Sequence, residues 1–242
     1  MNQHGDFLWY ELMTPDPEAS AQFYGPVFGW TVQPPVEAMG NYRIFGLPSV
    51  DIGGFMPSPP SMAGAPPVWF GYVAVDDVDR SAAKAVELGG AQHVPPTDIP
   101  GVGRFAFLAD PDATMFYIMR GENDGTSRAY DPNAVGHCRW NELSSTDSAV
   151  AFGFYAALFG WTKGGAMPMG QMGDYQFLDQ GGKTFGALMK AAPDTRPGWR
   201  QYFGVADIDL ACQKITNAGG KVTDGPHEIP GGEYSAHARD PQ

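Results

Sequence analysis

The sequence Trp9-Tyr10-Glu11-Leu12 opens a series of motifs that continues with Phe23-Tyr24 and Phe28-Gly29-Trp30. The same series returns, at the same spacings, as Trp140-Asn141-Glu142-Leu143, Phe154-Tyr155 and Phe159-Gly160-Trp161. Glu11 and Glu142 are 131 residues apart in a chain of 242 residues, so each copy is long enough to bury a core of its own. The duplication predicts two similar domains, or two halves of one pseudosymmetric domain.

Each copy is predicted to begin with a strand and a helix. In residues 7–13 the odd-numbered and the even-numbered side chains, which would face opposite sides of a strand, are both largely apolar. This predicts a strand buried on both faces. The segment 14–18 has the cap candidates, early proline and acidic residues of a helix start, and Gly29 is a stop signal. Residues 146–160 repeat this design. Short strands are then expected at 42–47 and 50–56, with counterparts at 175–179 and 184–190.

A second strand and helix follow in each copy. Residues 68–75 and 198–205 match through paired aromatic residues, and the next helices begin near Asp77 and Asp207. A hairpin then leads to Asp110-Pro111 in one copy and to Asp240-Pro241 in the other. The chain is therefore predicted to be α+β, with four βαβββ modules. We expect a first domain at 1–122, a polar linker at 123–135 and a second domain at 136–242.

The two copies end differently. After Asp110-Pro111 the first copy continues through residues 114–119, which predict one more strand, whereas the sequence stops at Gln242. A sheet without its last strand would expose an edge to unwanted pairing. We therefore expect the natural chain to continue beyond Gln242, and a stop codon directly after that residue in the gene would contradict this.

The balance of charge argues against nucleic-acid and membrane partners. The chain has 15 Lys and Arg against 27 Asp and Glu, a formal net charge of -12, which opposes binding to phosphate backbones or anionic lipid. No apolar run approaches the roughly 18 residues that a membrane span needs, and residues 1–5 are polar. We expect a cytoplasmic protein whose partner is a small organic molecule, and we leave a homodimer open.

Cysteine and histidine spacing gives no sign of a metal site or a disulfide framework. Cys138 and Cys212 are the only cysteines and form no C-x-x-C pair. The five histidines are scattered without metal-binding spacing: His4, His93, His137, His227 and His237.

On these residues the chain resembles the vicinal oxygen chelate superfamily, which contains glyoxalase I, extradiol dioxygenases, and bleomycin-binding and fosfomycin-resistance proteins. The resemblance rests on the opening strand, the Thr-Pro-Asp helix start, the Phe-Tyr and Phe-Gly-Trp motifs and the Asp-Pro turn, and it covers nearly the whole chain. It implies four βαβββ modules paired into two tandem glyoxalase-like domains, whose mixed sheets curl into cups around a small-molecule site. The fold alone does not define an activity.

The resemblance also implies three places for metal ligands, which enzymes of the superfamily fill with His, Glu or Gln. By position these places fall on Trp9 and Trp140, on Phe70 and Arg200, and on Tyr117, which has no counterpart in the second copy. Indole, phenyl and guanidinium groups do not supply the donors that divalent metals need. We expect no metal and no other cofactor. A divalent metal stays open only if the register assigned to these ligands is wrong.

The residues at and beside these places predict an aromatic lining for substrate binding. They are Trp9, Phe70, Tyr72 and Tyr117 in the first copy, and Trp140, Arg200 and Tyr202 in the second. Such a cup suits a flat or apolar organic molecule. Arg200 is placed to bind a carboxylate or phosphate of a ligand, and a salt bridge to Glu142 or Glu11 is equally open.

Three residues are candidates for catalysis. Glu11 and Glu142 share the face of the two tryptophans, and a buried carboxylate can act as a general base. The same residue at matched places in both copies favours a bracing role instead. His237 lies in an expected strand that borders the cup, where it could transfer protons, although a hydrogen-bonded structural histidine is the plainer interpretation.

Three functions are open at this point. The first is a glyoxalase-like protein that binds a small organic molecule without the usual metal, with or without turnover. The second is a metal-dependent lyase, similar to lactoylglutathione lyase, or a dioxygenase. The third is a module that sequesters a drug or metabolite, for which an acidic surface would attract a cation.

Metal analysis separates these functions. Because the three ligand places hold side chains without suitable donors, we expect the purified protein to contain no stoichiometric divalent metal. Elemental analysis by mass spectrometry measures this, and stoichiometric zinc, nickel, manganese or iron would contradict the expectation.

Overall fold

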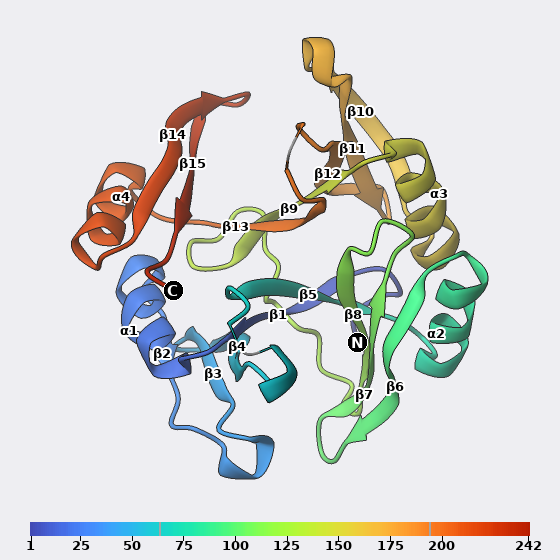
Figure 1. Ribbon diagram of the computed structural model, residues 1–242, viewed down its shortest axis with the longest axis horizontal. Helices are drawn as coiled ribbons and strands as arrows, with labels where there is room; N and C mark the ends of the chain where they lie inside the picture. The colour runs from blue at the N-terminus through green and yellow to red at the C-terminus, as the bar shows by residue number, and fades with distance from the viewer. Residues whose placement is uncertain (63, 194) are drawn as a thin grey trace. The chain divides into compact units, whose positions relative to one another are not determined.

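The computed structural model describes residues 1–62, 64–193 and 195–242, and Figure 1 labels its helices and strands. The chain forms two compact units, and each combines segments from both copies of the repeat. Unit 1 consists of Met1–Tyr10, Trp69–Pro132 and Cys138–Tyr202. Unit 2 consists of Glu11–Val68, Asn133–His137 and Phe203–Gln242. The predicted domain boundaries at 122 and 136 stay a prediction.

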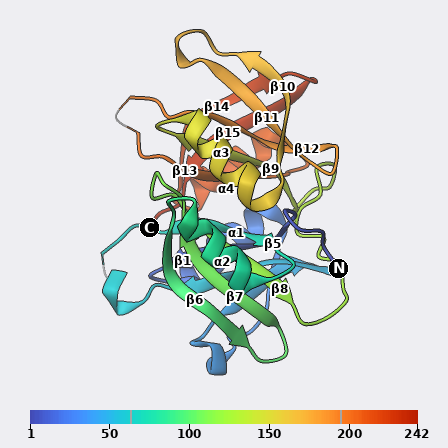
Figure 2. The same ribbon diagram turned by 90° about the vertical axis from the view of Figure 1, so that its right-hand side faces the viewer.

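Unit 1 contains two mixed sheet segments, each with a helix packed against it. Its strands are the first half of β1 (Phe7–Thr14), β5 (Val68–Ala74), β6 (Ala91–Ile99), β7 (Gly103–Ala109), β8 (Met115–Gly121), β9 (Cys138–Ser145), β10 (Thr162–Pro168), β11 (Asp174–Gln180), β12 (Lys183–Lys190) and β13 (Gly198–Phe203). They follow the orders β1-β5-β8-β7-β6 and β10-β11-β12-β9-β13. Helix α2 (Val78–Glu87) lies on β6, β7 and β8 (Figure 2), and α3 (Ser148–Phe159) packs on β9 and β12.

Unit 2 is smaller and has the same kinds of parts. Its strands are the second half of β1, β2 (Thr31–Val32), β3 (Arg43–Leu47), β4 (Val50–Pro57), β14 (Lys221–Ile229) and β15 (Glu233–Arg239). They follow the order β2-β3-β4-β1, with β14 and β15 paired to each other. Helices α1 (Pro17–Phe28) and α4 (Ile208–Asn217) contact one another. The α+β fold class predicted from the sequence is confirmed.

The helix starts and stops follow the motifs of the repeat. The Asp16 carboxylate accepts hydrogen bonds from the backbone N–H groups of the first turn of α1, and Asp147 does the same for α3. Gly29 and Gly160 end these helices with φ of 73° and 75°, a left-handed conformation that glycine adopts without strain. The predicted boundaries of both helices are confirmed.

The copies differ most after their first helix. The sequence pattern predicts no strand there, but the structure has the two-residue β2 in the first copy and the seven-residue β10 in the second. Pro34 and Pro35 follow β2, and proline has no N–H to donate to a sheet, so the strand ends early. The second copy has no proline before Pro168, and β10 therefore pairs with β11 from Thr162 to Pro168.

The tryptophans of the Phe-Gly-Trp motifs connect the two copies. The indole N–H of Trp161 donates to the Gly5 carbonyl at 2.9 Å in unit 1, and that of Trp30 donates to the Gly136 carbonyl at 2.7 Å in unit 2. Both bonds are buried, and Gly5 and Gly136 each precede the opening strand of the opposite copy. Each copy therefore supplies a core residue whose hydrogen-bond partner is in the other copy.

Aromatic side chains pack around both tryptophans. Trp161 contacts Phe7, Phe185 and Trp199 in unit 1, with ring centroids 4.7–5.9 Å apart. Trp30 contacts Phe45 and Phe203 in unit 2, at 4.2 and 5.0 Å. Large rings bury much apolar area, so these two clusters are the cores of the two units.

A tyrosine and an aspartate form a second pair of connections. In unit 1 the hydroxyl of Tyr155 donates to the Asp110 carboxylate at 3.0 Å, and in unit 2 Tyr24 donates to Asp240 at 2.7 Å. Burial raises the pKa of the Asp110 carboxyl, and the hydrogen bonds it accepts from the Thr114 N–H and Tyr155 oppose that rise. The Phe-Tyr and Asp-Pro motifs of the repeat are thus explained by one bond that joins opposite copies.

Within the described ranges, no helix is long and apolar enough to cross a membrane.

We predict that Trp161→Phe lowers the free energy of unfolding by about 1–3 kcal/mol, because it leaves the buried Gly5 carbonyl without its donor. Trp30→Phe is expected to have a similar cost at Gly136. Chemical denaturation followed by circular dichroism measures both. Val150→Ala, at a side chain on α3 that is 52% exposed, is the control and should change stability by less than about 0.5 kcal/mol. Equal stability of Trp161→Phe and the unchanged protein would contradict the structural role.

Candidate functional site

The Glu142 carboxylate is the centre of a polar cluster in unit 1. One of its oxygens accepts a hydrogen bond from the hydroxyl of Tyr175 at 2.8 Å and another from Tyr202 at 3.2 Å. The other oxygen accepts one from the Arg200 guanidinium at 3.2 Å. The indole N–H of Trp140 donates in turn to the Tyr175 hydroxyl at 2.8 Å. We call these five residues the Glu142 cluster.

Three strands bring the Glu142 cluster together. Trp140 and Glu142 are two residues apart on β9, Arg200 and Tyr202 are two residues apart on β13, and Tyr175 is on β11. Side chains two residues apart on a strand point to the same face of a sheet. Alternation therefore directs Trp140 and Glu142 to one face of β9, and Arg200 and Tyr202 to one face of β13. The register through β12 puts Tyr175 on the same face as Glu142, since Phe177 and Glu142 both lie opposite Ala187.

Burial in the Glu142 cluster is uneven. The side chain of Glu142 is 9% exposed, whereas that of Arg200 is 55% exposed. Trp140, Tyr175 and Tyr202 are half-buried. The carboxylate is thus enclosed by its donors, and the guanidinium extends from it to the surface.

The charges within the cluster stabilise one another. Burial would lower the pKa of Arg200, but its hydrogen bonds with Tyr202 and Glu142 and its attraction to the Glu142 charge outweigh that effect and raise the pKa. Burial and the neighbouring Glu142 charge raise the pKa values of the Tyr175 and Tyr202 hydroxyls well above their ordinary range. At neutral pH, therefore, Arg200 is a cation and both phenols keep their protons.

Aromatic rings surround the polar groups of the cluster. Phe177 on β11 packs edge to face against Trp140, with ring centroids 6.0 Å apart, and against Tyr175 at 5.9 Å. Met167 on β10 lies directly opposite Tyr175 in the strand register, so it shares that face. The cluster is consequently bordered by half-buried apolar side chains that a ligand can contact.

The matching place in the first copy is filled by its own side chains. Tyr72 and Tyr117 stack with ring centroids 4.2 Å apart, and Phe107 stacks on Tyr117 at 4.3 Å. Phe70 packs edge to face on both Phe107 and Tyr117. Phe70 is only 2% exposed, Tyr72 6% and Tyr117 5%. These three predicted binding residues are therefore brought together, but as a packed group rather than an open lining.

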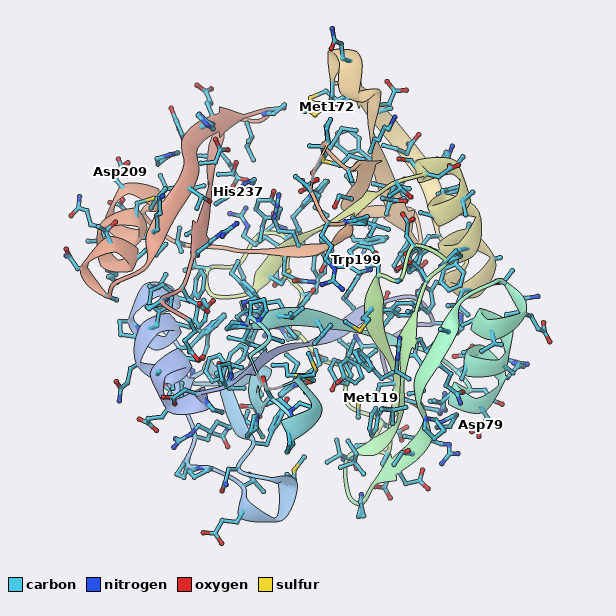
Figure 3. All side chains as sticks on the ribbon, viewed as in Figure 1. Asp79, Met119, Met172, Trp199, Asp209 and His237 are labelled. Carbon is cyan, nitrogen blue, oxygen red and sulfur yellow. The ribbon has the colours of Figure 1, made fainter. Side chains whose placement is uncertain are left out.

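The other predicted residues are placed separately. Trp9 is half-buried on the part of β1 that belongs to unit 1, and Glu11 is buried on the part that belongs to unit 2. His237 lies on β15 (Figure 3), with its Nδ1 3.9 Å from an Asp224 oxygen. Hydrogen bonding by His227 lowers the pKa of Asp224. Catalytic roles for Glu11, Glu142 and His237 stay predictions.

Tyr175 and Phe177 are site residues that the sequence pattern did not indicate. Both lie in the strand that was expected at 175–179, and the repeat pairs Tyr175 with Tyr42. The signal that could have found Tyr175 is its place two strands away from Glu142 in the module, where alternate side chains face the same cup. The salt bridge between Arg200 and Glu142, which had been left open, is present at 3.2 Å.

The donors at the implied metal places do not fit a divalent cation. In unit 1 those places hold the Trp9 and Trp140 indoles, the Phe70 ring, the Tyr117 phenol and the Arg200 guanidinium, which is a cation itself. Among the residues that the structure describes, no group of three His, Cys, Asp or Glu side chains could hold a metal ion.

Comparison with known proteins identifies the family. The model for the Glyoxalase/Bleomycin resistance protein/Dioxygenase superfamily matches residues 6–118 and again residues 134–242. The chain belongs to this superfamily. The predicted tandem of glyoxalase-like regions is confirmed, since both copies match the same family model.

Relatives in this superfamily carry different names. The chain is 33% identical to the "Putative glyoxylase CFP32" of Mycobacterium tuberculosis (strain CDC 1551 / Oshkosh), over 97% of this chain and 90% of that protein. It is 30% identical to the anthracycline biosynthesis protein DauV of Streptomyces sp. (strain C5), over 93% of this chain and 86% of that protein. These names do not agree on one activity.

Solved structures of the superfamily share the fold. The 2,3-dioxygenase LapB from Pseudomonas sp. KL28 has a TM-score of 0.67 at 12% identity, covering 99% of this chain and 90% of that one. The Mn(II)-bound glyoxalase from Novosphingobium aromaticivorans has a TM-score of 0.63 at 15% identity, covering 98% and 83%. At these identities the likeness establishes the fold and no chemistry.

We predict that alkaline titration of the native protein leaves at least five of its ten tyrosines protonated until the protein unfolds. The pKa values of Tyr10, Tyr130, Tyr155, Tyr175 and Tyr202 are raised by burial. A raised folded-state pKa stabilises the fold at pH below the unfolded value of about 10, and that stabilisation is lost as the pH rises further. Ultraviolet absorbance of tyrosinate measures the titration, and ionisation of all ten at about pH 10 in the folded protein would contradict it.

Proposed function

We propose that this chain binds a flat aromatic molecule at the Glu142 cluster and that it does so without a divalent metal. The observation that carries the proposal is the exposure of Arg200, whose side chain is 55% accessible although it is hydrogen-bonded to a buried carboxylate. We propose that the remaining N–H groups of Arg200 donate hydrogen bonds to oxygen atoms of the ligand.

The rings around Arg200 favour an aromatic ligand. Trp140, Tyr175, Phe177 and Tyr202 are all half-buried, so a flat molecule can cover the apolar area that they leave exposed. Burial of such area supplies affinity, and a few polar groups fix orientation, as in most small-molecule sites.

The relatives support a ligand of this kind. DauV is named as an anthracycline biosynthesis protein, and anthracyclines are fused aromatic ring compounds. The other relative is named "Putative glyoxylase CFP32". Both names are compatible with a flat molecule that presents oxygen atoms to Arg200.

Metal-independent binding follows from the same residues. In the second copy the implied ligand places hold Trp140 and Arg200, so a ligand oxygen would meet the Arg200 guanidinium where the resemblance implies a metal ion. A metal-dependent lyase or dioxygenase is the alternative function, and it requires donors that these side chains do not have.

We predict that at least one of two naphthol probes, 2-acetyl-1-naphthol and 1-hydroxy-2-naphthoate, binds to the purified full chain and that EDTA leaves its affinity unchanged. Arg200→Gln should weaken that binding by about tenfold or more, because it removes a charged hydrogen-bond donor. Isothermal titration calorimetry measures both affinities.

Arg120→Gln is the matched control for this substitution. Arg120 is exposed on β8 of the same unit and donates to the Asp76 carbonyl, so its loss should leave probe affinity unchanged. Absence of binding by both probes, or equal weakening by the two arginine substitutions, would overturn the proposed function. Loss of binding in EDTA would favour the metal-dependent alternative.

A further inference from the structure

The Glu142 cluster contains one positive and one negative charge. Arg200 is the cation, and the Glu142 carboxylate at 3.2 Å is the anion. The other polar groups of the cluster, the Tyr175 and Tyr202 hydroxyls and the Trp140 indole, are neutral donors. The charge of Arg200 is therefore already balanced before any ligand arrives.

The anion in this pair is held firmly. Three donors converge on Glu142, one of them a guanidinium, and the side chain is 9% exposed. Hydrogen bonds to a charged carboxylate are stronger than those between neutral groups. Since Tyr175 is itself fixed by the Trp140 indole, Glu142 cannot turn away to let a ligand replace it without breaking several bonds.

We infer that the site selects uncharged aromatic carbonyl compounds, such as hydroxyaryl ketones and quinones, over aromatic carboxylates and phosphates. This inference rests on the proposed function and names the ligand class of the same site. A carbonyl oxygen accepts hydrogen bonds from the exposed N–H groups of Arg200 and adds no charge. The half-buried rings of Trp140 and Phe177 cover the aromatic part of the same molecule.

An anionic ligand is repelled at this site by a charge of the same sign, that of Glu142. A carboxylate bound to the exposed edge of Arg200 would have to share one guanidinium with the Glu142 carboxylate, which lies 3.2 Å from it. Two carboxylates that share one guanidinium repel each other. The carboxylate would also lose more hydration than a ketone on entering. Both effects favour the neutral ligand.

The two naphthol probes test this selection because they share the fused rings and the hydroxyl. They differ only in a methyl ketone against a carboxylate. We expect the unmodified chain to bind 2-acetyl-1-naphthol at least about tenfold more tightly than 1-hydroxy-2-naphthoate. Calorimetry at low and at physiological ionic strength gives both dissociation constants, and salt should narrow the difference by screening the repulsion.

Glu142→Gln tests the cause of the selection. Glutamine has the shape of glutamate but no charge, so Arg200 would become an unbalanced cation. We expect this variant to bind 1-hydroxy-2-naphthoate more tightly than the unmodified chain does, by about tenfold, so that the preference for 2-acetyl-1-naphthol is reduced or lost. Arg120→Gln again is the control and should keep the original ratio.

The outcomes separate the two proposals. Tighter binding of the carboxylate by the unmodified chain would overturn the selection for neutral carbonyl compounds while leaving the proposed function in place. Binding of neither probe would overturn the proposed function itself. If Glu142→Gln does not fold, the ratio measured on the unmodified chain and its dependence on salt still decide the inference, since an equal or reversed ratio would contradict it.

Discussion

Two buried hydrogen bonds from indole N–H groups hold this duplicated chain in its folded form. Trp161 and Trp30 each find their acceptor at the glycine that precedes the opening strand of the opposite copy. A buried donor without a partner costs more than the bond itself contributes, so neither copy completes its core alone. The Tyr155–Asp110 and Tyr24–Asp240 bonds repeat this exchange at the other end of the motif series. The spacing of motifs that the two copies share is the spacing that this exchange requires.

On this shared scaffold the two copies differ in one decisive position. Phe70 and Arg200 occupy matched places on β5 and β13 of the same unit. The phenyl ring packs with Tyr117 and Phe107 and closes its side of the molecule to a ligand. The guanidinium instead pairs with Glu142 and stays half exposed. The same position is therefore a packed core position in the first copy and a partly exposed polar group in the second.

Much of the fold could be predicted from the sequence because its signals are local. Asp16 and Asp147 cap their helices and Gly29 and Gly160 end them, and these effects depend on a few neighbouring residues. The exchange of contacts between copies was not predictable in this way. Nothing near Trp161 in the sequence indicates that its acceptor is Gly5, because that bond depends on which modules pack together.

The candidate site was also predicted only in part, because local sequence pattern places some of its residues and strand packing places the others. Alternation along β9 and β13 correctly grouped Trp140, Glu142, Arg200 and Tyr202 on one face. The sequence did not predict the hydrogen bond from Tyr175 to Glu142, because the position of Tyr175 depends on the register between β11 and β12, which the sequence does not specify. Phe70, Tyr72 and Tyr117 were expected to line a cup, but stacking makes them a packed group. Sequence pattern shows that rings share a face and cannot show whether space remains between them.

The composition of unit 2 has a consequence for how the protein is made. Its parts come from residues 11–68, 133–137 and 203–242, so its core cannot assemble while the chain is only partly synthesised. Strands β2, β3 and β4 are synthesised before α4 and Phe203, which complete the core of unit 2. Until then Trp30 lacks its contact with the Phe203 ring and its hydrogen bond to the Gly136 carbonyl. During that interval apolar rings that will later be buried face water or a chaperone. The early half of the chain is thus the part most exposed to aggregation during translation.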